Sequence, residues 1–155
     1  MVFCSILLAL LPAFGLSNTF EVERVAIEEM EQDNVLRIAN YLGSEQSGRR
    51  VWVRTQEDSF DGLYYRFFFE SSLKSMPRGA ILELELLLDQ NPEPITFTLP
   101  LPDYRPNGRE IWVGLTGTDW ELGVNQVLPT AWKLIIRSSA GEVLVEKRSF
   151  IWGTR

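Results

Sequence analysis

Acidic side chains are the residues of this chain whose spacing comes nearest to a catalytic arrangement. Glu83 and Glu85 alternate with leucines in the stretch AILELELLLD, so both point to one face of a strand. Two carboxylates about 5–10 Å apart carry out glycoside hydrolysis when they lie in a cleft. Alternating glutamates on an outer sheet face are more commonly solubilising residues. We therefore interpret this pair as surface residues, and Asp119 in TGTDW is a second candidate with as little support.

The residues that usually assist catalysis are scarce. The chain has no histidine and a single cysteine, Cys4. Histidine is the commonest general base and the standard partner of a nucleophilic serine or cysteine. Ser71 to Lys74 has a Ser-x-x-Lys spacing, but it lies at the end of an expected strand rather than at the start of a helix. Zinc sites of Cys and His are excluded, and the sequence predicts no catalytic residue, no metal and no cofactor.

The stretch Glu57 to Gly62 half-resembles a calcium loop. It has oxygen-bearing side chains at alternate positions and glycine in sixth place. An EF-hand needs a glutamate twelve residues into the loop, and Phe68 stands there. A turn between two strands explains the stretch without an ion.

The tryptophans give the one indication of a binding site. Aromatic side chains facing solvent on a β-sandwich can stack on sugar rings or anchor a protein partner. Trp52 and Trp112 are out of phase with their aliphatic neighbours, which predicts an outer face, and Trp120 lies in an expected loop. Trp132 is in phase with its neighbours and should be core. We predict a ligand-binding patch of Trp52, Trp112 and Trp120, with packing under loops or against the other sheet as the alternative.

Short alternating segments separated by Gly, Pro, Asn and Asp turns predict an all-β fold. Gly141 lies in the polar loop of a C-terminal hairpin, Ala131 to Gly153, and can adopt the positive φ that the turn needs. In Ala80–Asp89 a helix competes, because Leu and Glu favour it, but strict alternation favours a strand. The expected strands are Phe20–Ile27, Val35–Leu42, Arg50–Gln56, Leu63–Glu70, Ala80–Asp89, Ile95–Leu101, Ile111–Leu115 and the two arms of the hairpin.

Two strands have a predicted place in the sheets. The aromatic run of Leu63–Glu70 indicates a central strand covered on both faces. Pro100 and Pro102 remove backbone donors, so Ile95–Leu101 should be a sheet edge.

About nine strands and no convincing amphipathic helix predict an antiparallel two-sheet sandwich of the immunoglobulin or fibronectin type, with a closed barrel as the alternative. The length of 155 residues suits one domain, which we place at residues 18–155. A hydrophobic fraction of 45% and a charged fraction of 23% are typical of a globular protein. The net charge of −6 disfavours nucleic-acid binding, which requires a basic face.

The first 17 residues, MVFCSILLALLPAFGLS, predict an export signal. Their apolar run, Ile6 to Leu11, is shorter than the roughly 20 residues that span a bilayer, and small residues follow it. We expect cleavage after Gly15 or Ser17 and no membrane-spanning segment afterwards. A buried first strand or a membrane-anchored helix is the alternative. The missing Asn-x-Ser/Thr sequons fit a bacterial protein of the periplasm, envelope or extracellular space.

These observations predict an exported, non-catalytic β-sandwich module with a binding or structural role. Its partner is a protein or a polysaccharide, and the residues do not choose between them. The alternative is a small carboxylate-dependent carbohydrate-active enzyme.

Overall fold

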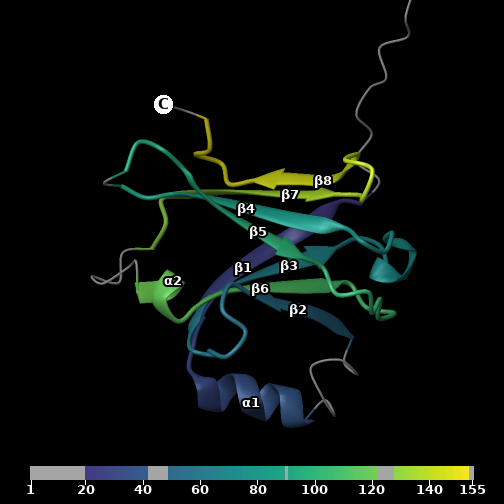
Figure 1. The fold of residues 1–155 in the computed structure, drawn as a ribbon, viewed down its shortest axis with the longest axis horizontal. Helices are drawn as coiled ribbons and strands as arrows, with labels where there is room; N and C mark the ends of the chain where they lie inside the picture. Colours follow the sequence, from purple (N-terminus) through teal and green to yellow (C-terminus); the bar gives the residue numbers. More distant parts are fainter. Residues whose placement is uncertain (1–19, 42–48, 90, 122–127, 154–155) are drawn as a thin grey trace, which may run out of the picture.

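The computed structural model describes residues 20–41, 49–89, 91–121 and 128–153. The strands in this part of the chain are β1 (Val22–Met30), β2 (Arg50–Arg54), β3 (Gly62–Phe69), β4 (Ile81–Leu87), β5 (Ile95–Pro100), β6 (Glu110–Thr116), β7 (Ala131–Arg137) and β8 (Val143–Arg148). The helices are α1 (Gln32–Tyr41), the short 3-10 helix η1 (Leu73–Ser75) and α2 (Thr118–Glu121). The strands form two four-stranded sheets, with the order β1-β3-β6-β2 in sheet A and β5-β4-β7-β8 in sheet B (Figure 1).

The inward faces of the two sheets share one apolar core. On β4, Leu82 and Leu84 are fully buried, while Glu83 between them points to the outer face of sheet B. From the other side, Phe67 of β3 meets the ring of Trp132 with centroids 5.6 Å apart. Each such large apolar side chain contributes about 1.5–3 kcal/mol when it is fully buried. The two-layer all-β sandwich and the core position of Trp132 are therefore confirmed.

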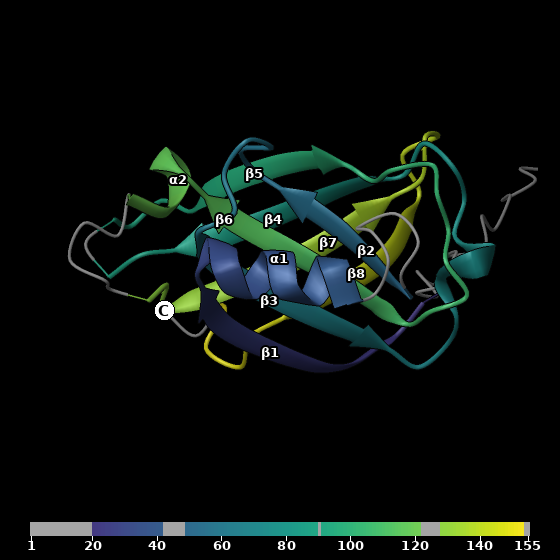
Figure 2. The same ribbon diagram turned by 90° about the horizontal axis from the view of Figure 1, so that it is seen from below.

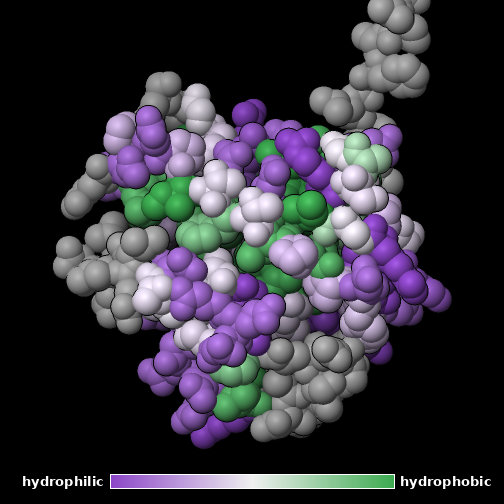
Figure 3. All heavy atoms as spheres, viewed as in Figure 1, coloured by the Kyte–Doolittle hydropathy of each residue, from purple (hydrophilic) through white to green (hydrophobic). Residues whose placement is uncertain are grey.

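Most of the predicted strands are present, in the places that their sequences indicated. The strand β4, for which helix was the competitor, lies between β5 and β7, and β3 lies between β1 and β6. The strand β5 is a sheet edge, as its prolines indicated. Figure 3 shows apolar surface in the middle of this face of the molecule. Phe97 and Leu99 of β5 are half-buried and pack against the core. Gly141 has a φ of 86° in the hairpin loop.

The prediction of a strand at Val35–Leu42 is wrong over its described residues, because residues 35–41 lie in helix α1. Val35 and Ile38 are three residues apart, and Ile38 and Leu42 four, which is also helical spacing. The helix covers the outer face of sheet A (Figure 2), where fully buried Val35 packs with Tyr64 and Trp112. Its first backbone amide, Gln32 N, donates to Asp61 Oδ1 in the turn before β3. The described residues therefore contain eight strands rather than nine.

The expectation of purely antiparallel sheets is also corrected, because β2 runs parallel to β6. Val51 is opposite Ile111 and Val53 is opposite Val113. Parallel strands need a crossover connection, usually a helix. Helix α1 supplies it by carrying the chain across the outer face of sheet A from β1 at one edge to β2 at the other (Figure 2). The predicted export signal, residues 1–17, lies outside the described residues.

Candidate binding site

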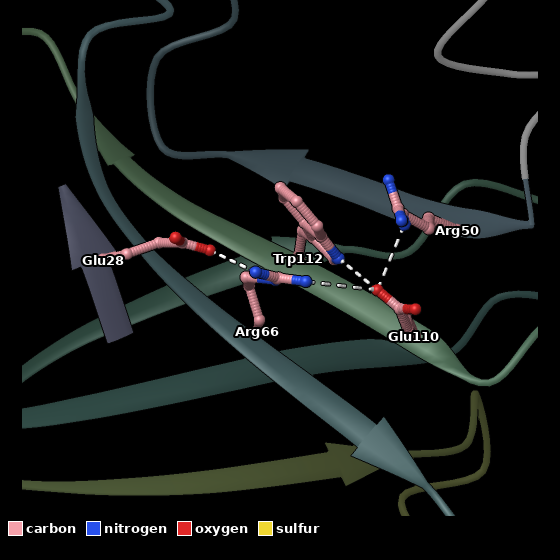
Figure 4. Close-up of polar contacts among 5 residues, drawn as sticks. All are labelled: Glu28, Arg50, Arg66, Glu110 and Trp112. Carbon is pink, nitrogen blue, oxygen red and sulfur yellow. Dashed lines mark hydrogen bonds and ion pairs between the residues drawn. The ribbon is translucent and has the colours of Figure 1, made fainter. Parts of the chain in front are cut away.

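A row of charged and aromatic side chains crosses the outer face of sheet A. Each strand contributes to it: Glu28 comes from β1, Arg66 from β3, Glu110 and Trp112 from β6, and Arg50 from β2 (Figure 4). The residues of this row meet because strands far apart in the sequence are neighbours in the sheet, with Arg50 opposite Glu110 and Arg66 opposite Trp112.

One carboxylate oxygen joins the middle of this row. Oε2 of Glu110 lies 3.0 Å from Arg50 Nε and accepts a hydrogen bond of 2.8 Å from Trp112 Nε1. The same oxygen lies 4.0 Å from Arg66 Nη2. Arg66 also forms an ion pair with Glu28. Charged hydrogen bonds of this kind are stronger than neutral ones, so the Glu110 carboxylate is held by donors of the protein itself.

The two arginines of the row also lie against the ring of Trp112. The guanidinium carbon is 4.8 Å from the ring centroid for Arg50 and 4.2 Å for Arg66. A cation over the face of an indole ring is attracted by about 0.5–2 kcal/mol. This arrangement orders the outer face of sheet A rather than leaving its arginines open to a ligand.

The structure brings together two of the three tryptophans of the predicted patch. Trp52 and Trp112 lie on the outer face of sheet A, as their phase indicated, with ring centroids 4.4 Å apart. Trp112 is only 1% exposed, because Val35 of helix α1 packs in its cluster, and Trp52 is half-buried. Trp120 lies in α2 and packs against the core between the sheets. The alternation along a strand predicts which face of the sheet a residue lies on. It does not predict that a helix covers that face.

The acidic candidates lie on separate elements. Glu83, on the outer face of sheet B, is paired with Arg137, whose Nε is 3.3 Å away. Asp119 Oδ2, in α2, accepts from Gln56 Nε2 at 3.4 Å. Asp61, in the calcium-like turn, accepts from the amide at the start of helix α1. Within the described ranges, no group of three or more Cys, Asp or Glu is placed to hold a metal ion.

Sequence reasoning missed a hollow of about 780 Å³ at one end of the sandwich. It lies where the β3–β4 connection meets the β5–β6 connection, on the right of Figure 1. Hydrophilic side chains are dense at this end in Figure 3. The polar residues of its lining are Arg49, Ser72, Tyr104, Asn107, Arg109 and Glu110. Two pairs of adjacent charged residues, Arg49-Arg50 and Arg109-Glu110, are visible in the sequence. The parallel pairing of β2 with β6, which the sequence does not show, brings the two pairs side by side.

Backbone contacts hold the floor of the hollow. Leu73 N donates to Gly108 O at 2.8 Å, and Phe69 N donates to Arg109 O at 2.7 Å. A Cβ at position 108 would lie 1.6 Å from the carbonyl oxygen of Arg49, so this contact requires glycine. The 3-10 helix η1, the start of β6 and the start of β2 are thereby fixed relative to one another.

Arg105 holds the wall of the hollow. Its Nε donates to Met76 O at 3.2 Å and its Nη2 to Pro77 O at 2.8 Å, and Nη1 donates to Pro102 O. Burial lowers the pKa of Arg105, an effect that the charge of Asp103 opposes. These bonds tie the loop that carries Tyr104, whose side chain is 43% exposed.

Two arginines of the hollow have no carboxylate of their own. Arg49 and Arg109 are exposed, and neither forms an ion pair with any residue in the described ranges. Glu110 lines the same hollow, but its carboxylate bonds Arg50 and Trp112. Both line the same hollow, so an anion bound there would be attracted by two positive charges.

No family model, curated protein or solved structure matches this chain. No helix in the described part of the chain is long and apolar enough to cross a bilayer.

Proposed function

We propose that the chain is an exported, non-catalytic β-sandwich module that binds a partner in the cell envelope or outside the cell. The observation that carries the proposal is the hollow beside β2 and β6, in a frame fixed by backbone hydrogen bonds, with exposed Arg49 and Arg109, which form no ion pair with any described residue. The charge-free apolar start of the chain and the absence of histidine support export and a non-catalytic role.

The sandwich is, in this proposal, of the fibronectin type. With β2 set aside, sheet A reads β1-β3-β6 and sheet B reads β5-β4-β7-β8. This is the order A-B-E and C′-C-F-G of a fibronectin type III sandwich, a two-sheet fold with Greek-key connections. Helix α1 and strand β2 are then an insertion between the first two strands.

The insertion builds the binding site. Strand β2 adds Arg50 beside the start of β6, and the residue before it, Arg49, has its carbonyl against Gly108. A plain seven-stranded sandwich would lack Arg49, one of the two arginines that line the hollow without an ion pair among the described residues. Insertions at the ends of a rigid sandwich are a common place for binding residues.

The rival function is a small carboxylate-dependent carbohydrate-active enzyme. Such an enzyme needs two carboxylates flanking the bond to be cleaved. Among the described residues that line the hollow, Glu110 is the one carboxylate, and Arg50 and Trp112 occupy its Oε2. Glu83 and Glu85 share the outer face of sheet B, where Arg137 pairs with the first and Lys133 is opposite the second. These partners favour binding over catalysis.

A glycan array probed with purified variants tests the proposal. Three versions of the chain are compared: the wild type, Arg49→Gln/Arg109→Gln, and the control Arg78→Gln/Arg148→Gln, which removes two exposed arginines outside the hollow. We expect selective binding by the wild type and the control and its loss in the first variant. Trp120→Ala should bind like the wild type, because Trp120 packs against the core. Cleavage of a glycan that one Glu→Gln substitution abolishes would overturn the proposal in favour of the enzyme.

A further inference from the structure

We infer that the hollow takes an acidic oligosaccharide, one whose sugar rings carry carboxylate or sulfate groups. This inference rests on the proposed binding function and adds the class of ligand to it.

The charges around the hollow select an anion. Its charged lining residues in the described part of the chain are Arg49, Arg109 and Glu110. Because the Glu110 carboxylate is paired with Arg50, the positive charges of Arg49 and Arg109 are not compensated within the hollow, in a chain whose net charge is −6. Guanidinium groups bind carboxylate and sulfate oxygens through two parallel hydrogen bonds. The acidic remainder of the surface disfavours indiscriminate binding of polyanions.

The uncharged lining fits a sugar. Ser72 Oγ and Asn107 Oδ1 are 3.0 Å apart in a hydrogen bond. The amide nitrogen of exposed Asn107 therefore keeps two donors for sugar hydroxyls. Tyr104 also lines the hollow and is 43% exposed, and a tyrosine side chain has an apolar aromatic body and a polar end. Planar donors beside an aromatic face suit a hydroxylated ring better than a simple inorganic anion.

The place of the hollow favours a saccharide over an acidic peptide. Extended peptides gain affinity by pairing their backbone along an exposed sheet edge. The hollow instead lies at the ends of strands, where β2 and β6 begin, and its floor amides at Phe69 and Leu73 already donate to Arg109 and Gly108. An oligosaccharide needs no such pairing. A volume of about 780 Å³ is within the range of about 300–1,000 Å³ typical of small-ligand sites.

The test is isothermal titration of the full chain with four defined probes. These are tetragalacturonate, which carries carboxylates; a heparin tetrasaccharide, which carries sulfates as well; cellotetraose, which is neutral; and tetraglutamate, an acidic peptide. We expect at least one acidic saccharide to bind about tenfold or more tightly than cellotetraose and tetraglutamate. Comparing the two acidic saccharides shows which anionic group the hollow prefers.

The variants localise the binding. Arg49→Gln and Arg109→Gln should each raise Kd about tenfold or more, because each removes a charged pair of hydrogen bonds. Tyr104→Ala should weaken binding and Tyr104→Phe should retain it. Arg78→Gln/Arg148→Gln removes the same charge elsewhere and should bind like the wild type. Thermal unfolding of each variant confirms that it is folded, and all these arginines are exposed.

Any titration result other than those expected above overturns the inference. The glycan array then shows whether the proposed binding function fails with it. Equal affinity for cellotetraose would refute the anionic ligand, and equal affinity for tetraglutamate would refute the saccharide. Binding that Arg49→Gln/Arg109→Gln leaves unchanged would refute the site. If none of the four probes binds but the array shows a selective partner, the module is a binding protein with another ligand. If neither shows binding, the inference of a saccharide ligand fails, and the proposed function is then that of a module that binds a protein partner.

Discussion

Arg50 and Glu110 face each other across a parallel strand pair, with Arg50 Nε 3.0 Å from Glu110 Oε2. This contact links the inserted strand β2 to the sandwich. It also occupies the carboxylate that would otherwise neutralise Arg49 or Arg109 in the adjacent hollow. The same pair therefore serves the fold and leaves the hollow positively charged.

Removal of the Glu110 carboxylate should destabilise the protein. Glu110→Ala leaves two half-buried arginines with one fewer partner and Trp112 Nε1 without an acceptor, so we expect a loss of about 2 kcal/mol in the free energy of unfolding. Glu110→Gln keeps an acceptor for Trp112 and should lose about 1 kcal/mol. Urea unfolding measures both. Glu23→Gln, an exposed residue of β1, is the control and should stay within about 0.5 kcal/mol of the wild type; equal losses at both positions would refute the role of this carboxylate.

Gly108→Ala should be among the most damaging small substitutions. Its Cβ would overlap the carbonyl oxygen of Arg49, so the start of β2 must move, and we expect a loss of about 3 kcal/mol or more. The matched control is Gly141→Asn, because Gly141 has open space around it and asparagine tolerates positive φ. That variant should lose less than about 1 kcal/mol. Similar melting temperatures for the two variants would contradict the close contact.

Tyr65→Phe should stabilise the protein. The hydroxyl of Tyr65 is buried and has no hydrogen-bond partner among the described residues. Removing a buried unpaired polar atom should raise the free energy of unfolding by about 1 kcal/mol at pH 7. Loss of stability in Tyr65→Phe, measured by urea unfolding, would show that the hydroxyl is hydrogen-bonded in solution.

The advantage of Tyr65→Phe should grow in alkali. Burial raises the pKa of Tyr65 above its ordinary value of about 10. Above pH 10 the unfolded chain releases this proton while the folded chain keeps it, so the wild type loses stability as the pH rises, by up to about 1.4 kcal/mol per pH unit. Below pH 10 both states are protonated at this group and it adds no pH dependence. The difference between wild type and Tyr65→Phe, followed from pH 8 to 11, isolates this effect; a constant difference would contradict it.

Asp61 should stabilise the N-terminus of helix α1. Its carboxylate accepts from Gln32 N, so Asp61→Ala should cost about 1 kcal/mol and speed amide hydrogen exchange in α1. Asp61→Asn keeps an acceptor and should cost less. Asp58→Ala removes an exposed aspartate from the same turn and should change neither quantity. Equal exchange rates in the Asp61 and Asp58 variants would show that the turn does not hold the helix.

The first 19 residues should direct export. Fused to an alkaline phosphatase that is active only after export from a bacterial cytoplasm, they should give an active reporter, because an uncharged apolar run followed by small residues is read as a signal. Replacement of Leu8 by arginine should interrupt the run and abolish activity. An active reporter with both sequences, or with neither, would contradict the export proposal.

Much of the sandwich was readable from the sequence because its strands bury one face and expose the other. The alternation in β4 and the prolines of β5 placed these strands correctly, since such a pattern directly records which side chains are buried. The strand prediction for Val35–Leu42 was wrong because the apolar residues of this short segment fit both strand and helix spacing. Its covering role depends on Tyr64 and Trp112, which are distant in the sequence.

The hollow could not be predicted from the sequence, because it depends on how the strands are paired. Arg49 and Arg109 are 60 positions apart in the sequence, and nothing in either segment shows that β2 pairs with β6 or that the pairing is parallel. The tryptophans were the visible candidates, since large aromatics stand out in a sequence. Trp52 and Trp112 do share a face, but Trp112 lies in the cluster that α1 covers, which only the packing of that helix reveals.

The most direct test of the account is a titration of isotopically labelled full chain with tetragalacturonate or the heparin tetrasaccharide, whichever binds more tightly, followed by backbone amide NMR and by mass analysis of the ligand. We predict that the shifted amides gather at Arg49, at Ser72 and from Tyr104 to Arg109, and that the ligand is recovered at its original length. Shifts centred on Glu83 and Glu85 of sheet B, together with a shortened ligand, would contradict both the place of the site and its non-catalytic character.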